Sequence, residues 1–345
     1  MPSVGVLAAL AALVLLGVAH ALFWRWRLRT PGREDELLRV ATRDGWQLAL
    51  ARRRPRAAGR RPPVLLVHGI AMNRQAFDFG IERYSIAAHL ARAGFDCFSL
   101  DLRGHGDSRR GPTSRWTLDT YLEEDLPAAL DAIHAATGEA QVLYVGHSQG
   151  AILGMAACAL HAPRIRALVA LAGPAHFDSQ PRLRALVRFG HLPLARHLRL
   201  LARAVAPFSG WWHPAPFEIA INMRNVERPI YRRLLANAIE DLQPGVLDQF
   251  EACIRDDTFR SCDGRLDYRA LFPACTQPAL FIAAEKDGLA PPAVVEAAFE
   301  RWGGPRRYWS CGRDYGHADV LLGRNAPEVV FPMIRDFLLE NSEEG

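Results

Sequence analysis

Short apolar runs alternate along most of the chain with stretches in which apolar residues recur three or four positions apart. The runs predict strands at residues 38–42, 46–52, 64–67, 96–100, 141–145, 166–171, 279–283 and 308–311. The periodic stretches predict helices at residues 86–93, 118–136, 151–160 and 326–339. The first two strands flank Asp44-Gly45 and form a hairpin. The remaining alternation predicts an α/β fold with a mostly parallel sheet covered by helices on both faces.

About 100 residues between Gly173 and Pro278 interrupt this alternation. Loops between strands and helices in α/β proteins usually span about 2–6 residues, so this segment is predicted to be an insertion. Its leucines and valines recur at helical spacing. We therefore expect a core of residues 36–173 and 278–342, with a helical cap of residues 174–277 above the carboxyl ends of the strands.

The predicted cap is basic in its first part. No acidic residue occurs between Asp178 and Glu218, whereas six arginines do: Arg182, Arg184, Arg188, Arg196, Arg199 and Arg203. Apolar and cationic positions on one segment are typical of a helix that lies on a membrane surface. A solvated face of a helix packed on the core has the same composition, and the sequence leaves both interpretations open.

The amino-terminal segment is almost wholly apolar. Residues 4–24 are long enough to cross a bilayer of about 30 Å, and Arg25, Arg27 and Arg29 follow at once. We therefore expect residues 1–29 to form a single-pass anchor, with the body on the cytoplasmic side by the positive-inside rule. Ala19-His20-Ala21 resembles a cleavage site, so a signal peptide and secretion form the alternative. The missing positive charge before the apolar run and the length of that run favour the anchor.

The composition and charge of the chain limit the classes of binding partner that we expect. The 345 residues carry a net charge of +5, and nothing in the chain resembles a nucleic-acid-binding module, so we attribute the basicity to surface solvation and attraction to anionic lipid. The six cysteines contain no C-x-x-C pair, and no histidine cluster has metal-ligand spacing. We expect neither a metal nor a cofactor.

The most informative motif is Gly146-His147-Ser148-Gln149-Gly150, which lies between a predicted strand and a predicted helix. A serine in this context is typical of a nucleophile elbow, a tight turn that lifts the hydroxyl above the sheet. The elbow also places the Gln149 backbone N–H at the start of a helix, where it can receive an oxyanion.

A serine nucleophile needs a base and an acid that orients the base. Asp287 follows the strand at 279–283, and His317 follows the strand at 308–311, in the chain order that this architecture requires. We therefore expect Ser148, His317 and Asp287 to form a catalytic triad. Glu285 and Asp319 remain alternatives for the acid.

The loop after the strand at 64–67 is predicted to supply the second oxyanion donor. His68-Gly69 adds little bulk there, so the Ile70 backbone N–H can face the serine, with Ala71 as the alternative. His147 adjoins Ser148 but is expected to point elsewhere. The polar turn at residues 101–108 is interpreted as a network that braces the loops.

These residues together resemble the α/β-hydrolase family from about residue 38 to residue 339. The resemblance rests on His68-Gly69, Arg103-Gly-His-Gly-Asp-Ser108, the elbow, Asp287 and Gly316-His317. Within the family, residues 144–150 and 315–319 are similar to the acid-lipase branch, and residues 103–106 to monoacylglycerol lipases. The acid-lipase likeness implies a secreted or lysosomal enzyme that hydrolyses neutral lipid esters, whereas the arginine flank favours the cytoplasmic side.

The sequence thus predicts a membrane-anchored serine hydrolase that cleaves carboxylic esters, above all acyl lipids, through an acyl-enzyme. The apolar cap residues favour a long acyl group; they include the aromatics Phe208, Trp211, Trp212 and Phe217. Two alternatives stay open. One is an acyltransferase or thioesterase on the same fold, and the other is a non-catalytic, membrane-tethered protein.

Overall fold

The computed structural model describes residues 3–59, 61–177, 181–210 and 218–342. Its centre is one eight-stranded sheet, in the order β1-β2-β4-β3-β5-β6-β7-β8. The strands are β1 (Glu36–Ala41), β2 (Gln47–Arg53), β3 (Val64–Val67), β4 (Cys97–Asp101), β5 (Val142–His147), β6 (Ile165–Leu171), β7 (Ala279–Ala283) and β8 (Arg306–Ser310). The helices that cover the sheet are α2 (Ile86–Arg92), α3 (Leu118–Thr120), α4 (Leu126–Thr137), α5 (Gln149–Leu160), α10 (Pro292–Arg301), α11 (Asp319–Leu322) and α12 (Ala326–Glu340).

The pairing of the strands confirms the predicted topology. β1 and β2 form the expected hairpin, and β2 is also antiparallel to β4. All other neighbours, from β4 through β3 and β5 to β8, are parallel. The carboxyl ends of β3, β5, β7 and β8 therefore meet at one edge of the sheet, where the loops that carry chemistry are expected.

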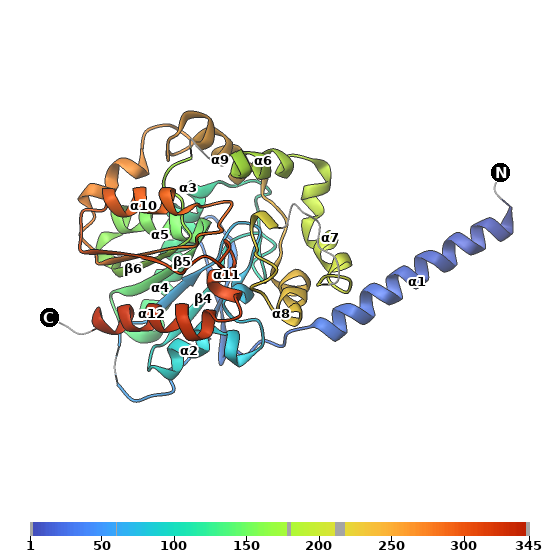
Figure 1. The fold of residues 1–345 in the computed structure, drawn as a ribbon, viewed down its shortest axis with the longest axis horizontal. Helices are drawn as coiled ribbons and strands as arrows, with labels where there is room; N and C mark the ends of the chain where they lie inside the picture. Colours follow the sequence, from blue (N-terminus) through green and yellow to red (C-terminus); the bar gives the residue numbers. More distant parts are fainter. Residues whose placement is uncertain (1–2, 60, 178–180, 211–217, 343–345) are drawn as a thin grey trace.

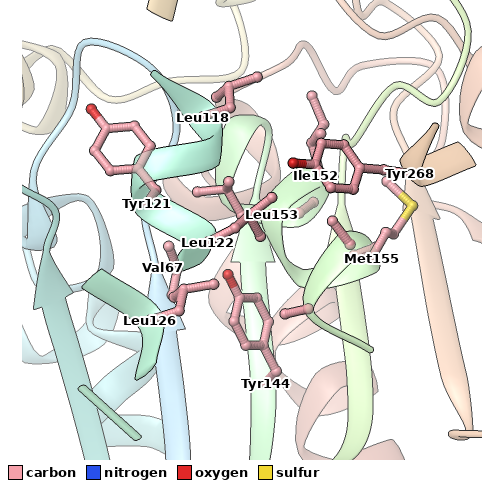
Figure 2. Close-up of a cluster of buried hydrophobic side chains, with 14 of the residues drawn as sticks. Val67, Leu118, Tyr121, Leu122, Leu126, Tyr144, Ile152, Leu153, Met155 and Tyr268 are labelled. Atoms are coloured by element: carbon pink, nitrogen blue, oxygen red, sulfur yellow. The ribbon is translucent and has the colours of Figure 1, made fainter. Parts of the chain in front are cut away.

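Alternate residues of the inner parallel strands enter opposite apolar layers, as the pleat of a strand requires. Leu65 and Val67 of β3 belong to the layer that contains α4, α5 and α10, whereas Val64 and Leu66 belong to the layer that contains α2 and α12. Figure 2 shows part of the first layer, where leucines of the α3–α4 region meet β5 and α5. In Figure 1, α2 and α12 lie below the sheet and α5 and α10 above it. This double cover explains why the inner strands β3 and β7 are apolar and buried throughout.

The helix predicted over residues 118–136 contains an irregular turn. Residues Tyr121–Asp125 form a π-helical turn between α3 and α4. Pro127 follows, and proline has no N–H to donate to the carbonyl of Glu123 four residues earlier. Arg43 Nη2 donates to that carbonyl instead, over 2.8 Å. The break therefore has a local cause that periodicity alone does not reveal.

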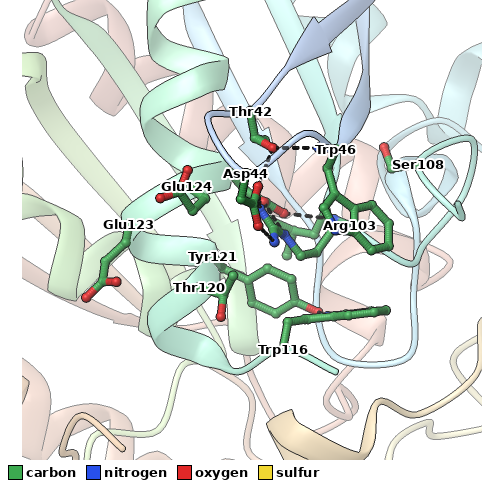
Figure 3. A network of polar contacts seen from close by, with 12 residues as sticks. Thr42, Asp44, Trp46, Arg103, Ser108, Trp116, Thr120, Tyr121, Glu123 and Glu124 are labelled. Atoms are coloured by element: carbon green, nitrogen blue, oxygen red, sulfur yellow. Dashed lines mark hydrogen bonds and ion pairs between the residues drawn. The ribbon is translucent and has the colours of Figure 1, made fainter. Parts of the chain in front are cut away.

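The turn at residues 101–108 forms a bracing network, as the sequence indicates (Figure 3). The Arg103 side chain is fully buried; its Nε donates to Asp125 over 2.6 Å, and its Nη2 donates to Asp44 over 3.0 Å. Ser108 Oγ donates to the Asp101 carbonyl over 2.8 Å. Burial raises the pKa of Asp125 to about 7, because a carboxylate loses its hydration there, while Arg103 lowers it. The network ties the β1–β2 hairpin to the helical layer.

The segment between β6 and β7 contains several helices. They are α6 (Pro181–Gly190), α7 (Leu198–Val205), α8 (Arg228–Arg233) and α9 (Pro244–Asp256). Figure 1 shows these helices along the upper and right-hand sides of the body, beyond the carboxyl ends of the strands.

Helix α1 (Val4–Leu28) extends away from the body (Figure 1). It is apolar and long enough to span a membrane, a property that anchors and signal sequences share. Its apolar side chains are exposed, among them Leu13, Leu15 and Leu16 at 65–69%. The carboxyl end of α1 is hydrogen-bonded to the body of the protein, since Asn237 Nδ2 donates to the Leu28 carbonyl over 2.9 Å.

Candidate active site

Ser148 occupies the turn between β5 and α5. Its backbone has φ 54° and ψ −117°, a strained conformation for a residue with a side chain. The flanking glycines make the turn possible. A Cβ on Gly146 would lie 2.3 Å from the Gly150 carbonyl oxygen, and one on Gly150 would lie 2.0 Å from the Val67 oxygen. The spacing of the motif therefore reflects close packing of β3, β5 and α5 around the serine.

The structure brings Ser148, His317 and Asp287 together from three separate loops. His317 Nε2 lies 2.7 Å from Ser148 Oγ, and His317 Nδ1 lies 2.7 Å from Asp287 Oδ2. The other carboxylate oxygen of Asp287 accepts the backbone N–H groups of Leu289 and Ala290, each over 2.7 Å. The carboxylate is thereby fixed in orientation. The imidazole can carry its proton on Nδ1 and accept the serine proton at Nε2.

The two other carboxylates considered from the sequence have different partners. Glu285 accepts from Ser310 Oγ over 3.4 Å, beside the surface residue Arg313. Asp319 accepts the Asn222 backbone N–H over 3.2 Å and Asn225 Nδ2 over 3.3 Å. Burial raises the pKa of Asp319 to about 7.

His147 has a contact that the sequence did not suggest. Its Nε2 donates to the backbone carbonyl of His317 over 2.9 Å, and the two ring centroids are 4.9 Å apart. Burial lowers the pKa of His147 to about 3, with a further contribution from His317, so the ring is neutral. Sequence patterns could not reveal this contact, because 170 residues separate the two histidines.

The loop after β3 passes close to the serine. A Cβ on Gly69 would lie 3.1 Å from Ser148 Cβ, so glycine allows this approach. The backbone N–H groups of Ile70 and Gln149 donate to no residue within the described part of the chain. Ile70, Gln149 and Ser148 line one cavity, and Ala71, the alternative to Ile70, is not among its lining residues.

The cavity beside Ser148 has mostly apolar walls. Helix α6 contributes Leu183, Leu186 and Val187, and α9 contributes Leu247 and Phe250. Phe208 is exposed, away from this cavity, while Trp211, Trp212 and Phe217 lie outside the described residues. An apolar wall over a serine and a histidine is suited to a hydrophobic acyl chain.

A strap of residues 219–225 joins the loop of Asp287 to the loop of His317. The Gly288 N–H donates to the Ile219 carbonyl over 3.2 Å, and the Ala318 N–H donates to the Ala220 carbonyl over 2.8 Å. A Cβ on Gly288 would lie 2.8 Å from the Ile219 oxygen. This segment between β6 and β7 therefore holds the loops of Asp287 and His317 in place, a role that sequence patterns did not reveal.

No group of three or more His, Cys, Asp or Glu side chains is arranged for a metal ion within the described parts of the chain. Ser148, Gln149 and His317 are the polar residues among those that line the cavity.

Comparison with known protein families places this geometry in context. A family model described as the α/β-hydrolase fold matches residues 62–194. Gastric triacylglycerol lipase of Homo sapiens is 32% identical over 196 residues, 48% of this chain and 49% of that protein. Lysosomal acid lipase/cholesteryl ester hydrolase of Homo sapiens is 34% identical over 131 residues, 34% of this chain and 33% of that protein. The chain thus matches half or less of the length of these relatives.

Solved structures are similar over more of the chain. A hydrolase from Pseudomonas aeruginosa has a TM-score of 0.63 at 22% identity, covering 88% of this chain and 98% of that one. A thermophilic esterase from Thermogutta terrifontis has a TM-score of 0.62 at 20% identity, covering 89% and 100%. A membrane phospholipase A has a TM-score of 0.60 at 18% identity, covering 97% and 96%. At these identities the likeness concerns the fold.

Proposed function

This chain is an α/β hydrolase that resembles esterases and lipases, and from that premise we propose that it is a membrane-anchored serine hydrolase of carboxylic esters, above all acyl lipids. The observation that carries the proposal is the pair of 2.7 Å contacts from Ser148 Oγ to His317 Nε2 and from His317 Nδ1 to Asp287 Oδ2.

In the proposed reaction, His317 takes the Ser148 proton as the hydroxyl attacks the ester carbonyl. The protonated imidazole then gives that proton to the departing alcohol, and the acyl group remains on Ser148. A water molecule then attacks the acyl carbonyl while His317 takes one of its protons. The bond from the carbonyl carbon to Ser148 Oγ breaks, His317 returns the proton to that oxygen, and the carboxylic acid is released. Asp287 stabilises the imidazolium and holds its Nδ1 proton.

The backbone N–H groups of Ile70 and Gln149 are the proposed oxyanion donors. Each attack places negative charge on the former carbonyl oxygen, which needs hydrogen-bond donors that are already in position. Both amides lack a partner among the described residues and belong to the cavity of Ser148. Gln149 also begins α5, so the helix dipole adds to the attraction.

The apolar cavity supports a hydrophobic acyl chain as the preferred substrate group. We propose that residues 36–173 and 278–342 form the catalytic core and that residues 174–277 form the cap that shapes this cavity. Residues 1–29 are the proposed anchor, and the three arginines after its apolar run favour a cytoplasmic body. If the segment is instead cleaved as a signal peptide, the mature chain begins after it.

Fluorophosphonate labelling of the full chain in detergent tests the nucleophile. We expect the unaltered protein to be labelled at Ser148 and the Ser148→Ala variant to remain unlabelled. The control variant Ser209→Ala, which changes another buried serine, should be labelled normally. Absence of labelling, or labelling that survives Ser148→Ala, contradicts the proposal.

Matched substrates test the reaction class. We expect Ser148-dependent hydrolysis of oxygen esters with acyl chains of graded length. Faster turnover of the matched thioester, or transfer to an added alcohol in preference to water, would assign the site to a thioesterase or an acyltransferase. Full biological activity of Ser148→Ala would indicate a non-catalytic role.

A further inference from the structure

Helix α7 and the turn after it expose apolar side chains along one line. Leu200, Ala204 and Phe208 follow each other at intervals of four residues, so they lie on one face. All three are exposed, Leu200 to 66% and Phe208 to 58%. Ala202 and Ala206, on the other side of the helix, are buried.

The charged residues of α7 turn towards the body instead of away from it. Arg199 Nη1 lies 3.6 Å from Glu240 Oε2, a carboxylate that is itself buried. Arg203 Nε donates to the Ala236 carbonyl over 3.2 Å. A helix on a water-soluble surface normally has the reverse arrangement, with apolar residues inward and charges outward. The outward face of α7 is therefore suited to an apolar medium.

Helix α1 lies directly beside this face. The rings of His20 and Phe208 stack with their centroids 5.6 Å apart and their planes at 14°. His20 precedes Arg25 by five residues, which corresponds to about 7.5 Å along a helix. If the arginines lie at the lipid headgroups, His20 and the ring of Phe208 stacked on it lie about 7.5 Å deeper. This depth is within the range of about 5–10 Å to which interfacial helices bury their apolar faces.

The surrounding charge fits an anionic lipid surface. Arg25 and Arg27 on α1 and Arg196 just before α7 are exposed, and the sequence contains no acidic residue between Asp178 and Glu218. Cationic side chains beside an apolar face are attracted to anionic headgroups while the apolar groups enter the lipid.

We propose that the face formed by Leu200, Ala204 and Phe208 inserts into the same bilayer that α1 crosses. The inference rests on the proposed membrane anchor and adds a second contact between the cap and the lipid. α6, just before α7 in the chain, also lines the cavity of Ser148 with Leu183, Leu186 and Val187. Insertion of α7 thus holds the acyl cavity near the membrane surface.

Site-directed labelling tests the insertion. The full chain, with Cys262 replaced by serine because it is the exposed cysteine of the described residues, is placed in nanodiscs that contain phosphatidylglycerol. A polarity-sensitive fluorophore is attached at Leu200→Cys or Phe208→Cys. The control is Leu266→Cys, an exposed leucine in the segment after α9, which lies on the side of the body opposite α1 in Figure 1.

We expect the labels at positions 200 and 208 to shift to shorter emission wavelengths and to be quenched by brominated lipid. The label at position 266 should report water and resist quenching. Labels at 200 and 208 that behave like the one at 266 would overturn the proposal.

Activity separates this inference from the proposed function. In the same nanodiscs, Leu200→Glu with Phe208→Glu should leave hydrolysis of a short, water-soluble ester unchanged. Hydrolysis of a long-chain ester in the bilayer should fall at least about tenfold, since two large apolar groups no longer enter the lipid. Leu266→Glu should change neither rate.

Equal rates for the double variant and the unaltered protein on both esters would overturn the insertion, as would equal losses on both. Failure of the unaltered protein to hydrolyse any ester would instead contradict the proposed function, and the labelling experiment would still decide the insertion.

Discussion

His147, the neighbour of the proposed nucleophile Ser148, is hydrogen-bonded to His317, the proposed base. His147 Nε2 donates a hydrogen bond of 2.9 Å to the backbone carbonyl of His317, so the residue before Ser148 holds the loop that presents the imidazole to it. The ring of His147 also borders Gly69, since a Cβ there would lie 3.1 Å from His147 Nδ1. One buried neutral side chain thus connects the elbow, the His317 loop and the loop of the proposed oxyanion donor.

Replacing His147 should therefore reduce catalysis more than substrate binding. We expect His147→Phe to lower kcat by about ten- to a hundredfold with a small change in KM, because a displaced base misses the reactive geometry. His147→Gln retains a side-chain donor and should recover part of the loss. Steady-state kinetics on a soluble ester, with the exposed His197→Gln as control, measures this. Equal kcat values for all four proteins would refute the role.

Asp287→Asn should abolish most activity without disturbing the fold. The two backbone N–H groups on Oδ1 hold the amide oxygen in that place, so the amide nitrogen replaces Oδ2 and donates to His317 Nδ1. The imidazole proton then moves to Nε2, which can no longer accept the serine proton. We expect kcat to fall about 10⁴-fold at neutral pH. Asp314→Asn, at an exposed carboxylate, should leave kcat unchanged.

Leu186→Trp should shift the preference towards shorter acyl chains. Leu186 lines the cavity of Ser148, and a larger side chain fills space that we assign to the acyl group. The ratio of kcat/KM for long over short esters should fall at least about tenfold, since each methylene excluded is worth about 0.8 kcal/mol. Phe189→Trp, an exposed position on the same helix, serves as control. An unchanged chain-length profile would show that the acyl group binds elsewhere.

Stability should depend on pH through Asp319. Burial raises the pKa of this carboxyl in the folded protein to about 7, above its ordinary value of 3.8. Folding therefore favours the protonated form, and this contribution to stability is complete below pH 3.8 and is lost as the pH rises through 7. Asp319→Asn stays neutral at both pH values. Its thermal midpoint should therefore exceed that of the unaltered protein by a few degrees more at pH 8 than at pH 4. Thermal unfolding across this range, with the exposed Asp314→Asn as control, measures the difference, and parallel curves for all three proteins would disprove the linkage.

The mostly parallel sheet could be predicted from the sequence because its strands are short apolar runs between helical stretches. The motif around Ser148 was readable for a similar reason: a strained turn against β3 and α5 permits glycine at Gly146 and Gly150 and little else. Asp287 and His317 were selected by their places after strands, since the carboxyl ends of parallel strands meet at one edge. Each of these signals is local, so each is visible in the order of residues.

The remaining features depend on segments that are distant in the chain. The contact between His147 and His317, the strap of residues 219–225 across the acid and histidine loops, and the stacking of Phe208 on His20 each join parts that no periodicity relates. The sequence left open whether the arginine-rich cap helix faces water or lipid. The tertiary structure decided which way its side chains turn, because Glu240 and the Ala236 carbonyl, supplied by another part of the cap, draw Arg199 and Arg203 inward and leave Leu200 outside.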